Sequence, residues 1–389
     1  MALYQILIVI LLFLVLANVI ANLAVFDGLR PVAPPSAGPL VSVLVPARNE
    51  ERNIEECVRS LLHQDYPNYE LIVLDDHSTD KTSDIAERLM SQMRNRRCTA
   101  QVIRGEPLPD GWTGKNWACQ QLAAASNGDF LLFTDADTTH AQGMLSAAVD
   151  YASRKQASLV SAWPQMITKT LGEKLIVPII VLLAMGFCPL WLQRLIQHRG
   201  DKMDPRHLRR FGVANGQFML FTREAYAHIG GHTAVCGHVV EDIALGREIA
   251  SRMGEGLRLF NCESLRFSTV RMYHSFGETW AGFTKNMRAV FEDQGIMFWV
   301  SGVILWLCLF GPFIALLKTP TSIGHIILVQ IGVIYVIRAL VTARFRTSWL
   351  GAFLHPIGIL LMLLIGINSW RKSVTGGVEW KGRTYRPEI

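Results

Sequence analysis

The stretch Phe130 to Thr138, FLLFTDADT, decides the fold, because an apolar strand ends there in two carboxylates that stand two residues apart. Side chains of a strand alternate between its faces, so Asp135 and Asp137 are predicted to lie on the same side at its carboxyl end. Two converging carboxylates suit a hard cation such as Mg²⁺, which often takes one or two carboxylates and completes its shell with substrate phosphates. An isolated Asp-x-Asp can also be a solvated turn, so the interpretation depends on the rest of the chain.

The composition of the 389-residue chain is that of a membrane protein with a large polar part, since 50% of the residues are hydrophobic and the mean hydropathy is +0.25. The formal net charge is +6, and the basic residues lie largely beside apolar segments. This favours anionic headgroups and phosphorylated substrates over nucleic acid as partners. The seven cysteines form no C-x-x-C pair, which fits a reducing cytosolic face without structural zinc.

Four apolar segments are each long enough to cross a bilayer, since a helix rises about 1.5 Å per residue and the hydrocarbon core is about 30 Å thick. They are Leu3–Val25, Ile296–Leu317, Ile323–Thr342 and Trp349–Trp370. A signal peptide is the other interpretation of the first segment, but no basic region precedes it and no persuasive small-residue cleavage site follows. We therefore expect an N-terminal transmembrane anchor (1–28), a Pro-rich linker (29–40), C-terminal transmembrane helices (296–372) and a basic tail (373–389).

The basic residues around the last apolar segment conflict with a single crossing. Arg344 and Arg346 precede it, and Arg371 and Lys372 follow it. Both groups cannot lie on the cytoplasmic side if the segment crosses once. A re-entrant segment would resolve the conflict, and the last one, which contains Pro356, is the first candidate.

From residue 41 the hydrophobic pattern predicts alternating strands and helices. VSVLVP and ELIVLDD read as buried strands, and apolar residues at helical spacing predict helices over about 50–63 and 81–93, the first with Asn49 as its N-cap. This order implies an α/β fold with a parallel central sheet and ligand-binding groups beyond the carboxyl ends of its strands.

Four carboxylates are expected along that edge, because Asp75 and Asp76 end the second strand as Asp135 and Asp137 end the later one. They would repel one another unless cations or hydrogen-bond donors were bound there, which argues against a solvated turn. Between them, LPDGWTGKNWA forms a tight loop that places Lys115 at the start of a helix. A lysine there either contacts a phosphate or sits in solvent.

The apolar run of residues 175–196 is long enough to span the membrane but is interrupted by Pro178 and Pro189. A single crossing would separate the paired aspartates from the following polar half, so we expect the run to lie along the bilayer. The basic stretch 194–210 suits anionic headgroups, and binding of a donor diphosphate is the alternative.

The second polar half contains a glycine-rich loop, GGHTAVCGHVV, that feeds a helix beginning at Glu241. Glu241 and Asp242 fall in the first turn, where the helix dipole stabilises carboxylates, so helix capping alone could explain them. The nearby histidines show no spacing typical of a zinc site.

The ordered motifs of the polar half resemble one family. VSVLVPARNEERNIEECVRSLLHQDYPNYELIVLDDHSTDKT, then TDAD, then VED after a glycine-rich loop resemble the membrane-anchored, inverting family-two glycosyltransferases of the GT-A fold. LPDGWTGKNWACQQ and RMYHSFGETWAGFTKNM resemble the branch that includes hopanoid-associated, carotenoid and ceramide glycosyltransferases, which act on lipids. The resemblance covers about 41–288 and implies a glycosyltransferase domain over 41–295 with 175–196 as an interfacial insert.

The resemblance implies a set of donor contacts. Those from the first two strands are Pro46, Ala47 and Glu50, which would line the nucleotide pocket, and Asp75 and Asp76, which would hold the base and ribose.

Further along the chain, the resemblance implies that Lys115 approaches the donor, that Asp135 contacts the nucleotide sugar, and that Asp137 beside it ligates Mg²⁺ or Mn²⁺ at the diphosphate. Asp242, next to Glu241, would be the general base. At the Q-x-x-R-W motif of processive synthases the chain has KNMRA, so only Arg288 is shared; it stays a candidate donor contact, and processive synthesis is disfavoured.

The implied protein is a multi-pass enzyme of the cell (inner) membrane with a cytoplasmic catalytic domain, which moves a sugar from a nucleotide donor, a UDP-sugar first, to a lipid hydroxyl. The alternatives are a polysaccharide synthase, a polyprenyl-phosphate glycosyltransferase, or a membrane scaffold that binds a nucleotide sugar without turnover. A transporter is disfavoured, because the four apolar segments contain no acidic residue.

Overall fold

The computed structural model describes residues 2–92, 98–197, 203–291, 294–318, 321–380 and 382–385. The chain divides into two compact units that alternate along the sequence. Unit 1 comprises Met1–Val25, Met166–Trp191 and Met272–Ile389, and unit 2 comprises Phe26–Gln165 and Leu192–Arg271.

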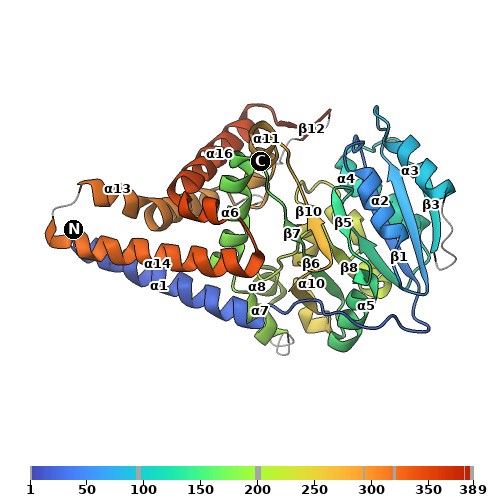
Figure 1. The fold of residues 1–389 in the computed structure, drawn as a ribbon, viewed down its shortest axis with the longest axis horizontal. Coiled ribbons are helices and arrows are strands. Elements are labelled where there is room, and N and C mark those ends of the chain that lie inside the picture. Colours follow the sequence, from blue (N-terminus) through green and yellow to red (C-terminus); the bar gives the residue numbers. More distant parts are fainter. Residues whose placement is uncertain are drawn as a thin grey trace. The chain divides into compact units, whose positions relative to one another are not determined.

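Unit 2 is built on a seven-stranded sheet of order β3-β2-β1-β4-β8-β6-β9 (Figure 1). β3, β2, β1 and β4 run parallel, β8 is antiparallel to both of its neighbours, and β9 is parallel to β6. The predicted α/β class with a mostly parallel sheet is therefore confirmed. The strands are β1 (Val41–Ala47), β2 (Tyr69–Asp75), β3 (Cys98–Arg104), β4 (Phe130–Phe133), β6 (Leu159–Trp163), β8 (Met219–Thr222) and β9 (Leu259–Glu263).

The helices of unit 2 cover the sheet and connect its strands. They are α2 (Ile54–Leu62), α3 (Thr82–Ser91), α4 (Gly114–Ala125), α5 (Met144–Lys155), α8 (Pro205–Arg209), α9 (Arg223–His228) and α10 (Glu241–Ser251), with short 3₁₀ turns at η2 (Gly231–Val235) and η3 (Met253–Glu255). The helices predicted after the first two strands are confirmed as α2 and α3, with later starts and earlier ends.

Asn49 is not the N-cap of the first helix, because α2 begins at Ile54 with Asn53 at the cap position. Asn49 instead has a left-handed backbone, with φ of 52°. Its side-chain oxygen accepts a hydrogen bond from the Thr79 N–H at 2.8 Å, and its own N–H donates to the Ser78 hydroxyl at 3.0 Å. Asn49 therefore ties the loop after β1 to the loop after β2.

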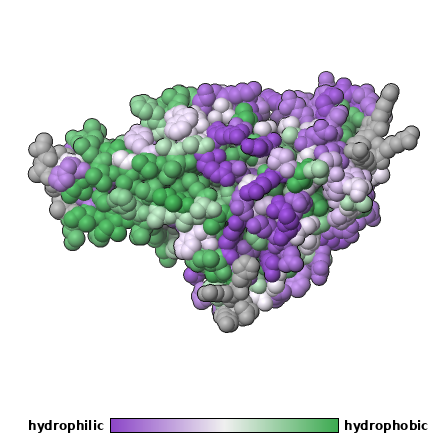
Figure 2. Space-filling view, turned by 60° about the horizontal axis from the view of Figure 1, so that its bottom comes forward, coloured by the Kyte–Doolittle hydropathy of each residue, from purple (hydrophilic) through white to green (hydrophobic). Residues whose placement is uncertain are grey.

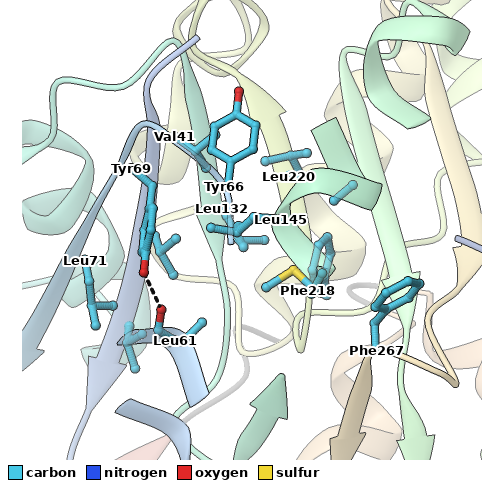
Figure 3. Packing of buried hydrophobic residues seen from close by; sticks show 14 of the residues in the cluster. Val41, Leu61, Tyr66, Tyr69, Leu71, Leu132, Leu145, Phe218, Leu220 and Phe267 are labelled. Atoms are coloured by element: carbon cyan, nitrogen blue, oxygen red, sulfur yellow. Dashed lines mark hydrogen bonds between the residues drawn. The ribbon is translucent and has the colours of Figure 1, made fainter. Parts of the chain in front are cut away.

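The core of unit 2 has two layers, because the side chains of each buried strand alternate between the faces of the sheet. Val43 and Val45 of β1 belong to one apolar cluster, and Leu44, which lies between them in the strand, belongs to the cluster on the other face. Figure 3 shows part of the first cluster, where the Tyr69 hydroxyl donates a hydrogen bond to the Leu61 carbonyl at 3.0 Å. The buried sheet gives the loops beyond its carboxyl edge a rigid base.

The strand that carries the paired aspartates is shorter than predicted. β4 ends at Phe133, the chain turns, and β5 (Thr138–His140) joins a second sheet of order β5-β10-β7 with β10 (Ser268–Val270) and β7 (Gln165–Met166). Asp135 and Asp137 thus belong to a turn between two sheets. The predicted alternation of a strand does not place them, because the register of β4 with β1 ends at Phe133 and Leu44, before either aspartate.

A short segment before the Pro-rich linker closes one edge of the large sheet, and we call Phe26–Leu29 the strap. Gly28 forms a parallel bridge with Glu263 of β9, the edge strand. The Leu29 N–H donates to the Glu263 carbonyl and the Glu263 N–H donates to the Asp27 carbonyl, both at 2.8 Å. A Cβ at position 28 would lie 2.7 Å from Glu263 Oε1, so a larger residue there would require the Glu263 side chain to move.

Unit 1 is mainly helical, and its described residues include four helices long and apolar enough to cross a membrane, which agrees with the four predicted segments. Figure 2 shows hydrophobic residues exposed over a large continuous surface on these helices. The candidate spans are Leu3–Val25 in α1 (Ala2–Val25), Gly295–Lys318 in the continuous run α12 (Gly295–Leu305), π-helical η4 (Trp306–Phe310) and α13 (Gly311–Lys318), Gly324–Phe345 in α14 (Thr321–Phe345), and His355–Thr375, which is α16.

The remaining helices are not single, uninterrupted candidate spans, and one of them, α7 (Leu190–Ile196), belongs partly to unit 2. α6 (Leu171–Phe187) and α7 are bent by 45° where the 175–196 segment was predicted to be interrupted. α11 (Phe276–Ala289) is mixed in polarity. The last predicted segment is split into α15 (Trp349–Phe353) and α16, and Pro356 lies in the first turn of α16, where proline is tolerated.

Candidate active site

Lys115 joins two of the predicted acidic groups. It lies in the first turn of α4, whose N-cap Thr113 accepts a hydrogen bond from the Asn116 N–H. Its ammonium is 2.6 Å from Asp135 Oδ1 and 2.7 Å from Glu241 Oε1. Burial lowers the pKa of Lys115, but the two carboxylates outweigh it and raise that pKa well above its ordinary value. Lys115 therefore stays charged and connects the turn after β4 to the start of α10.

Asp242 is held by backbone donors next to this ion pair. Its Oδ2 accepts a hydrogen bond from the Gly216 N–H, and its Oδ1 accepts one from the Ile243 N–H, both at 2.8 Å. Burial and the neighbouring Glu241 carboxylate raise the pKa of Asp242 to about 6, against the opposing effects of Lys115 and the two backbone donors. Asp242 is thus a carboxylate at neutral pH that can still take up a proton.

Gly216 allows the loop before β8 to approach this cluster. A Cβ at this position would lie 3.3 Å from Asp242 Oδ2 and 3.4 Å from Lys115 Nζ. Such contacts are tight, so a larger residue would displace the groups that Gly216 now supports. No motif of the sequence indicated this role for Gly216.

Asn116 fixes the glycine-rich loop that leads to α10. Its side-chain amide donates to the carbonyls of Val235, Cys236 and His238 at 2.6, 3.0 and 3.0 Å. The Thr113 N–H donates to the Cys236 carbonyl as well, at 2.9 Å. The start of α4 therefore positions both Lys115 and the loop that leads to Asp242. Sequence reasoning did not predict this role of Asn116.

A buried polar chain supports the Asp135–Asp137 turn from behind. Thr134 Oγ1 donates to the Gln217 carbonyl at 2.8 Å, so it accepts from His140 Nε2 at 2.9 Å, and His140 Nδ1 then accepts from the Ser268 hydroxyl at 3.0 Å. Burial lowers the pKa of His140 to about 3, which keeps the ring neutral. Sequence analysis missed this chain, because its members are far apart in sequence.

Three predicted acidic residues act on one buried thiol. Cys57 Sγ lies 3.8 Å from the Asp135 carbonyl. Burial raises the pKa of the Cys57 thiol, and the carboxylates of Asp137, Glu50 and Asp135 raise it further. These three carboxylates therefore lie close enough to Cys57 to affect its thiol. Glu50 also accepts a hydrogen bond from the Asn53 side chain at 3.0 Å.

The predicted base and ribose contacts follow adjacent strands. In the register of β1 and β2, Pro46 faces Leu74 and Ala47 faces Asp75. The Asp76 N–H donates to the Ala47 carbonyl at 2.8 Å, and the side chains of Asp75 and Asp76 are buried. These residues lie together at the ends of their strands, while their donor roles stay predictions.

Arg288 lies in unit 1, on α11. Its N–H donates to the Ser369 hydroxyl at 3.0 Å, and its guanidinium lies 5.3 Å from the centre of the Trp370 ring, a cation–π distance. Its predicted contact with the donor stays a prediction.

The acidic edge fits a cation that brings its own phosphate ligands. Within the described ranges, no group of three or more His, Cys, Asp and Glu residues could hold a metal ion. Mg²⁺ commonly uses one or two carboxylates together with substrate phosphates, and the Asp137 and Asp135 carboxylates can supply that number. The residues present therefore fit a metal that binds together with a diphosphate.

The fold is of the GT-A type. The mannosyltransferase PcManGT from Pyrobaculum calidifontis, solved with GDP-Man and Mn²⁺, shares the fold, with a TM-score of 0.52, 17% identity, and coverage of 96% of this chain and 99% of that one.

Two family models match in sequence: Glycosyl transferase family 2 over residues 42–230 and Glycosyl transferase family 21 over residues 196–388. The protein is a glycosyltransferase, and the family 2 match over the first polar half agrees with the resemblance of its motifs.

Curated relatives extend the similarity over most of the chain. The 4,4'-diaponeurosporenoate glycosyltransferase of Staphylococcus aureus strain MRSA252 is 28% identical over 360 residues, covering 89% of this chain and 88% of the relative. The protein of the same name from strain USA300 is 28% identical over 365 residues with the same coverage.

Proposed function

We propose that this protein is an inverting glycosyltransferase that moves a sugar from a nucleotide-diphospho-sugar to the hydroxyl of a membrane lipid, with Asp242 as the general base. The observation that carries the proposal is the connected group of Asp135, Lys115, Glu241 and Asp242, which joins the acidic turn after β4 to a carboxylate with a pKa near 6. The name of the S. aureus relatives supports a lipid-like acceptor.

Asp242 has the properties that this role needs. The acceptor oxygen attacks the anomeric carbon as its proton moves to the Asp242 carboxylate, and the bond from that carbon to the diphosphate oxygen breaks on the opposite face. One displacement of this kind inverts the anomeric carbon. A base with a pKa near 6 is ionised at neutral pH yet basic enough to accept the proton, and such transfer typically contributes about 10²- to 10⁴-fold to the rate.

Lys115 and Glu241 position this base in the proposal. Glu241 is buried beside Asp242, and Lys115 neutralises Glu241 and Asp135 together. Without Lys115, several carboxylates would repel one another and the incoming diphosphate. Lys115 is therefore both the support of the acidic edge and a direct candidate for contact with the donor.

Mg²⁺ or Mn²⁺ is the proposed cofactor, with Asp137 and Asp135 as its protein ligands. The bound metal would offset the negative charge that develops on the departing nucleoside diphosphate. Pro46, Ala47, Glu50, Asp75 and Asp76 are proposed to hold the nucleoside, and UDP is the first nucleotide to test.

The proposed site of action is the cytoplasmic face of the cell membrane. Four apolar helices in the described ranges, the excess of basic residues and the lack of a C-x-x-C pair among the seven cysteines support it. A membrane-resident acceptor then reaches the enzyme without leaving the bilayer.

The experiment that tests the proposal uses the purified full chain in detergent. It is incubated with UDP- and GDP-sugars and Mn²⁺, with and without lipid extract, and nucleoside diphosphate release and glycolipid are measured. We expect one donor to give lipid-dependent release, and the anomeric configuration of the product to be inverted. The absence of release with every donor, in the presence of lipid and metal, would contradict the proposal.

A further inference from the structure

The last apolar helix, α16, lies along the first half of the α12–α13 run. At one end of this contact, His355 Nε2 donates a hydrogen bond to the Leu309 carbonyl at 3.0 Å. At the other end, the Trp370 and Phe298 rings are stacked, with their centres 5.5 Å apart. The end of α16 therefore meets the beginning of α12, where the candidate span Gly295–Lys318 starts.

A pocket of about 580 Å³ lies at this meeting point. Two of its apolar side chains have little protein cover, since Ile296 is 81% exposed and Met297 is 49% exposed. Pockets that hold small molecules typically measure about 300 to 1,000 Å³, so this one has room for part of a lipid. Both helices contribute to the lining, which consists of Gln294, Gly295, Ile296, Met297, Trp299 and Trp370.

The Trp370 ring is held in place by its neighbours. The planes of Trp370 and Phe298 are 22° apart, the Trp299 ring meets Trp370 at 61° with the centres 5.3 Å apart, and the Arg288 guanidinium lies 5.3 Å from the Trp370 ring centre. Gly295 permits this close approach, because a Cβ there would lie 3.0 Å from Trp370 Cη2. The pocket is therefore preformed, which reduces the ordering cost of binding a ligand.

The position of the pocket along the helices suits the membrane interface. The apolar residues of α12 begin at Gly295, and α16 continues from Trp370 into the basic residues Arg371 and Lys372. The chain thus changes from apolar to charged at the pocket on both helices. Tryptophan is enriched at this level of a bilayer, because its ring is apolar and its N–H is polar.

Two cations adjoin the pocket in the chain. Arg371 and Lys372 are both exposed. The Arg371 guanidinium donates to Asn368 Oδ1 at 3.3 Å, and within the described ranges neither cation forms an ion pair. An anionic headgroup at the interface supplies the charge that would complement them. The aromatic walls, the exposed apolar residues and the cations together match the parts of one anionic phospholipid.

We propose that this pocket binds one anionic phospholipid, whose phosphate lies beside Arg371 and Lys372 and whose acyl chains contact Trp299, Trp370 and Ile296. The proposal rests on the membrane location given under the proposed function, and it is independent of the donor and of the acceptor. The bound lipid contacts α12 and α16 together, so it stabilises the folded form of unit 1.

The charges are tested with phosphatidylglycerol as the probe. The full chain in mild detergent is titrated with this lipid, and native mass spectrometry counts the lipid molecules that each chain retains. We expect one retained molecule, and the double variant Arg371→Gln/Lys372→Gln should raise its Kd by about 30-fold, because two cations beside the headgroup are lost. Arg346→Gln, an exposed cation after α14, is the matched control and should keep the parental Kd. An unchanged Kd for the double variant overturns the proposal.

The aromatic wall is tested separately. Trp299 is 42% exposed, so Trp299→Ala removes one side of the pocket while the buried interior of unit 1 stays filled. Trp349→Ala on α15, where the ring is 60% exposed, is the matched control. We expect Trp299→Ala to lose the retained lipid and Trp349→Ala to keep it, with the parental Tm for both variants in lipid-free detergent. Full retention by Trp299→Ala overturns the assignment of the lipid to this pocket.

Three further arms identify the occupant. Phosphatidylcholine should be retained far less than phosphatidylglycerol, and equal retention overturns the assignment to an anionic lipid. An excess of soluble glycerol phosphate should leave the lipid bound, and its displacement would show that a phosphate group alone occupies the site. Addition of UDP-sugars and Mn²⁺ should leave the mass of the bound lipid unchanged, and a gain of one sugar would assign the pocket to the acceptor instead. Retention is measured without a donor, so its failure leaves the proposed glycosyl transfer untouched.

Discussion

Asp242 is the side chain on which the proposed chemistry depends, because two backbone N–H groups aim its carboxylate and burial beside Glu241 raises its pKa. Asp242→Asn keeps the shape but removes the base, so we expect kcat to fall by about 10²- to 10⁴-fold with donor Kd nearly unchanged. Transfer rates and donor binding are measured on the same preparation. Asp150→Asn, which alters an exposed ion pair with Arg154, is the matched control and should keep the parental rate. A parental rate for Asp242→Asn would refute the assignment.

The pH profile should report the same carboxylate. The base works only when ionised, and the pKa of Asp242 is raised to about 6, so activity should be present above that pH and lost below it. We expect kcat/KM to fall about tenfold per pH unit on the acid side of pH 6. Steady-state rates between pH 5 and pH 8 would check this. If kcat/KM stayed constant down to pH 5, a group other than Asp242 would be the base.

Metal removal should act through Asp137. With EDTA we expect sugar transfer to stop and to return on addition of Mn²⁺ or Mg²⁺, because the leaving diphosphate then regains its counter-charge. Asp137→Ala should require far more metal for the same rate, as measured by metal titration. If this variant transfers sugar in EDTA as well as the parent does with Mn²⁺, the metal role is wrong.

For individual residues, the sequence identifies the charged site residues better than the residues that position them. Asp135, Asp137 and Asp242 stand in short motifs with few structural alternatives. Asn116, Gly216 and His140 act through contacts with residues far away in the chain, which no local pattern contains. Asn49 was misplaced for a related reason, since an asparagine before a helix suits an N-cap and a left-handed turn equally.

Among the elements, the break between α6 and α7 depends on α1. Asn22 donates to the carbonyls of Met185 and Cys188 at 2.8 and 2.7 Å, and it accepts from the Trp191 N–H at 3.0 Å. Pro189 has no N–H to donate to the Met185 carbonyl four residues earlier, and a side chain of another helix satisfies that carbonyl. The bend is therefore built into unit 1 by named hydrogen bonds.

Asn22→Leu should accordingly destabilise the protein. It removes the Asn22 hydrogen bonds to Met185, Cys188 and Trp191, while Asn18 still donates to the two carbonyls at 3.1 and 3.4 Å. We expect a loss of about 1–3 kcal/mol, seen as a lower Tm in detergent. Leu14→Val, at an exposed position of the same helix, is the comparison and should leave Tm nearly unchanged. Equal Tm values for Asn22→Leu and the parent would mean that water or lipid replaces these bonds.

Element type could be predicted from the sequence more securely than element ends. The apolar patterns of β1, β2 and α10 determine their positions, because each buries a full face. β4 was predicted too long, since the polar Thr134 and Asp135 follow its apolar run without a glycine or proline to mark the end. The break between α15 and α16 was not predicted, because the whole stretch from Trp349 is apolar and hydropathy does not distinguish a turn from a helix within it.

For the whole molecule, the charge distribution predicts a dependence on lipid composition. Basic residues follow α14 and α16 and recur in the 194–210 stretch, and each one near an anionic surface is worth about 1 kcal/mol. We expect transfer to rise with the fraction of anionic lipid in vesicles, and this gain to shrink between about 0.05 and 0.5 M NaCl because of screening. Vesicles of neutral lipid provide the control. A gain unaffected by salt would point to a requirement for one particular lipid.

The strap that pairs with β9 matters for anyone who wishes to produce the enzyme without its membrane helices. A soluble fragment beginning at Val41 would expose the outer backbone groups of Glu263, and an open sheet edge is a template for aggregation. A fragment beginning at Phe26 would keep the pairing and the packing of that ring on Trp163, whose centres lie 5.3 Å apart. Four residues beyond the anchor thus decide where the protein can be cut.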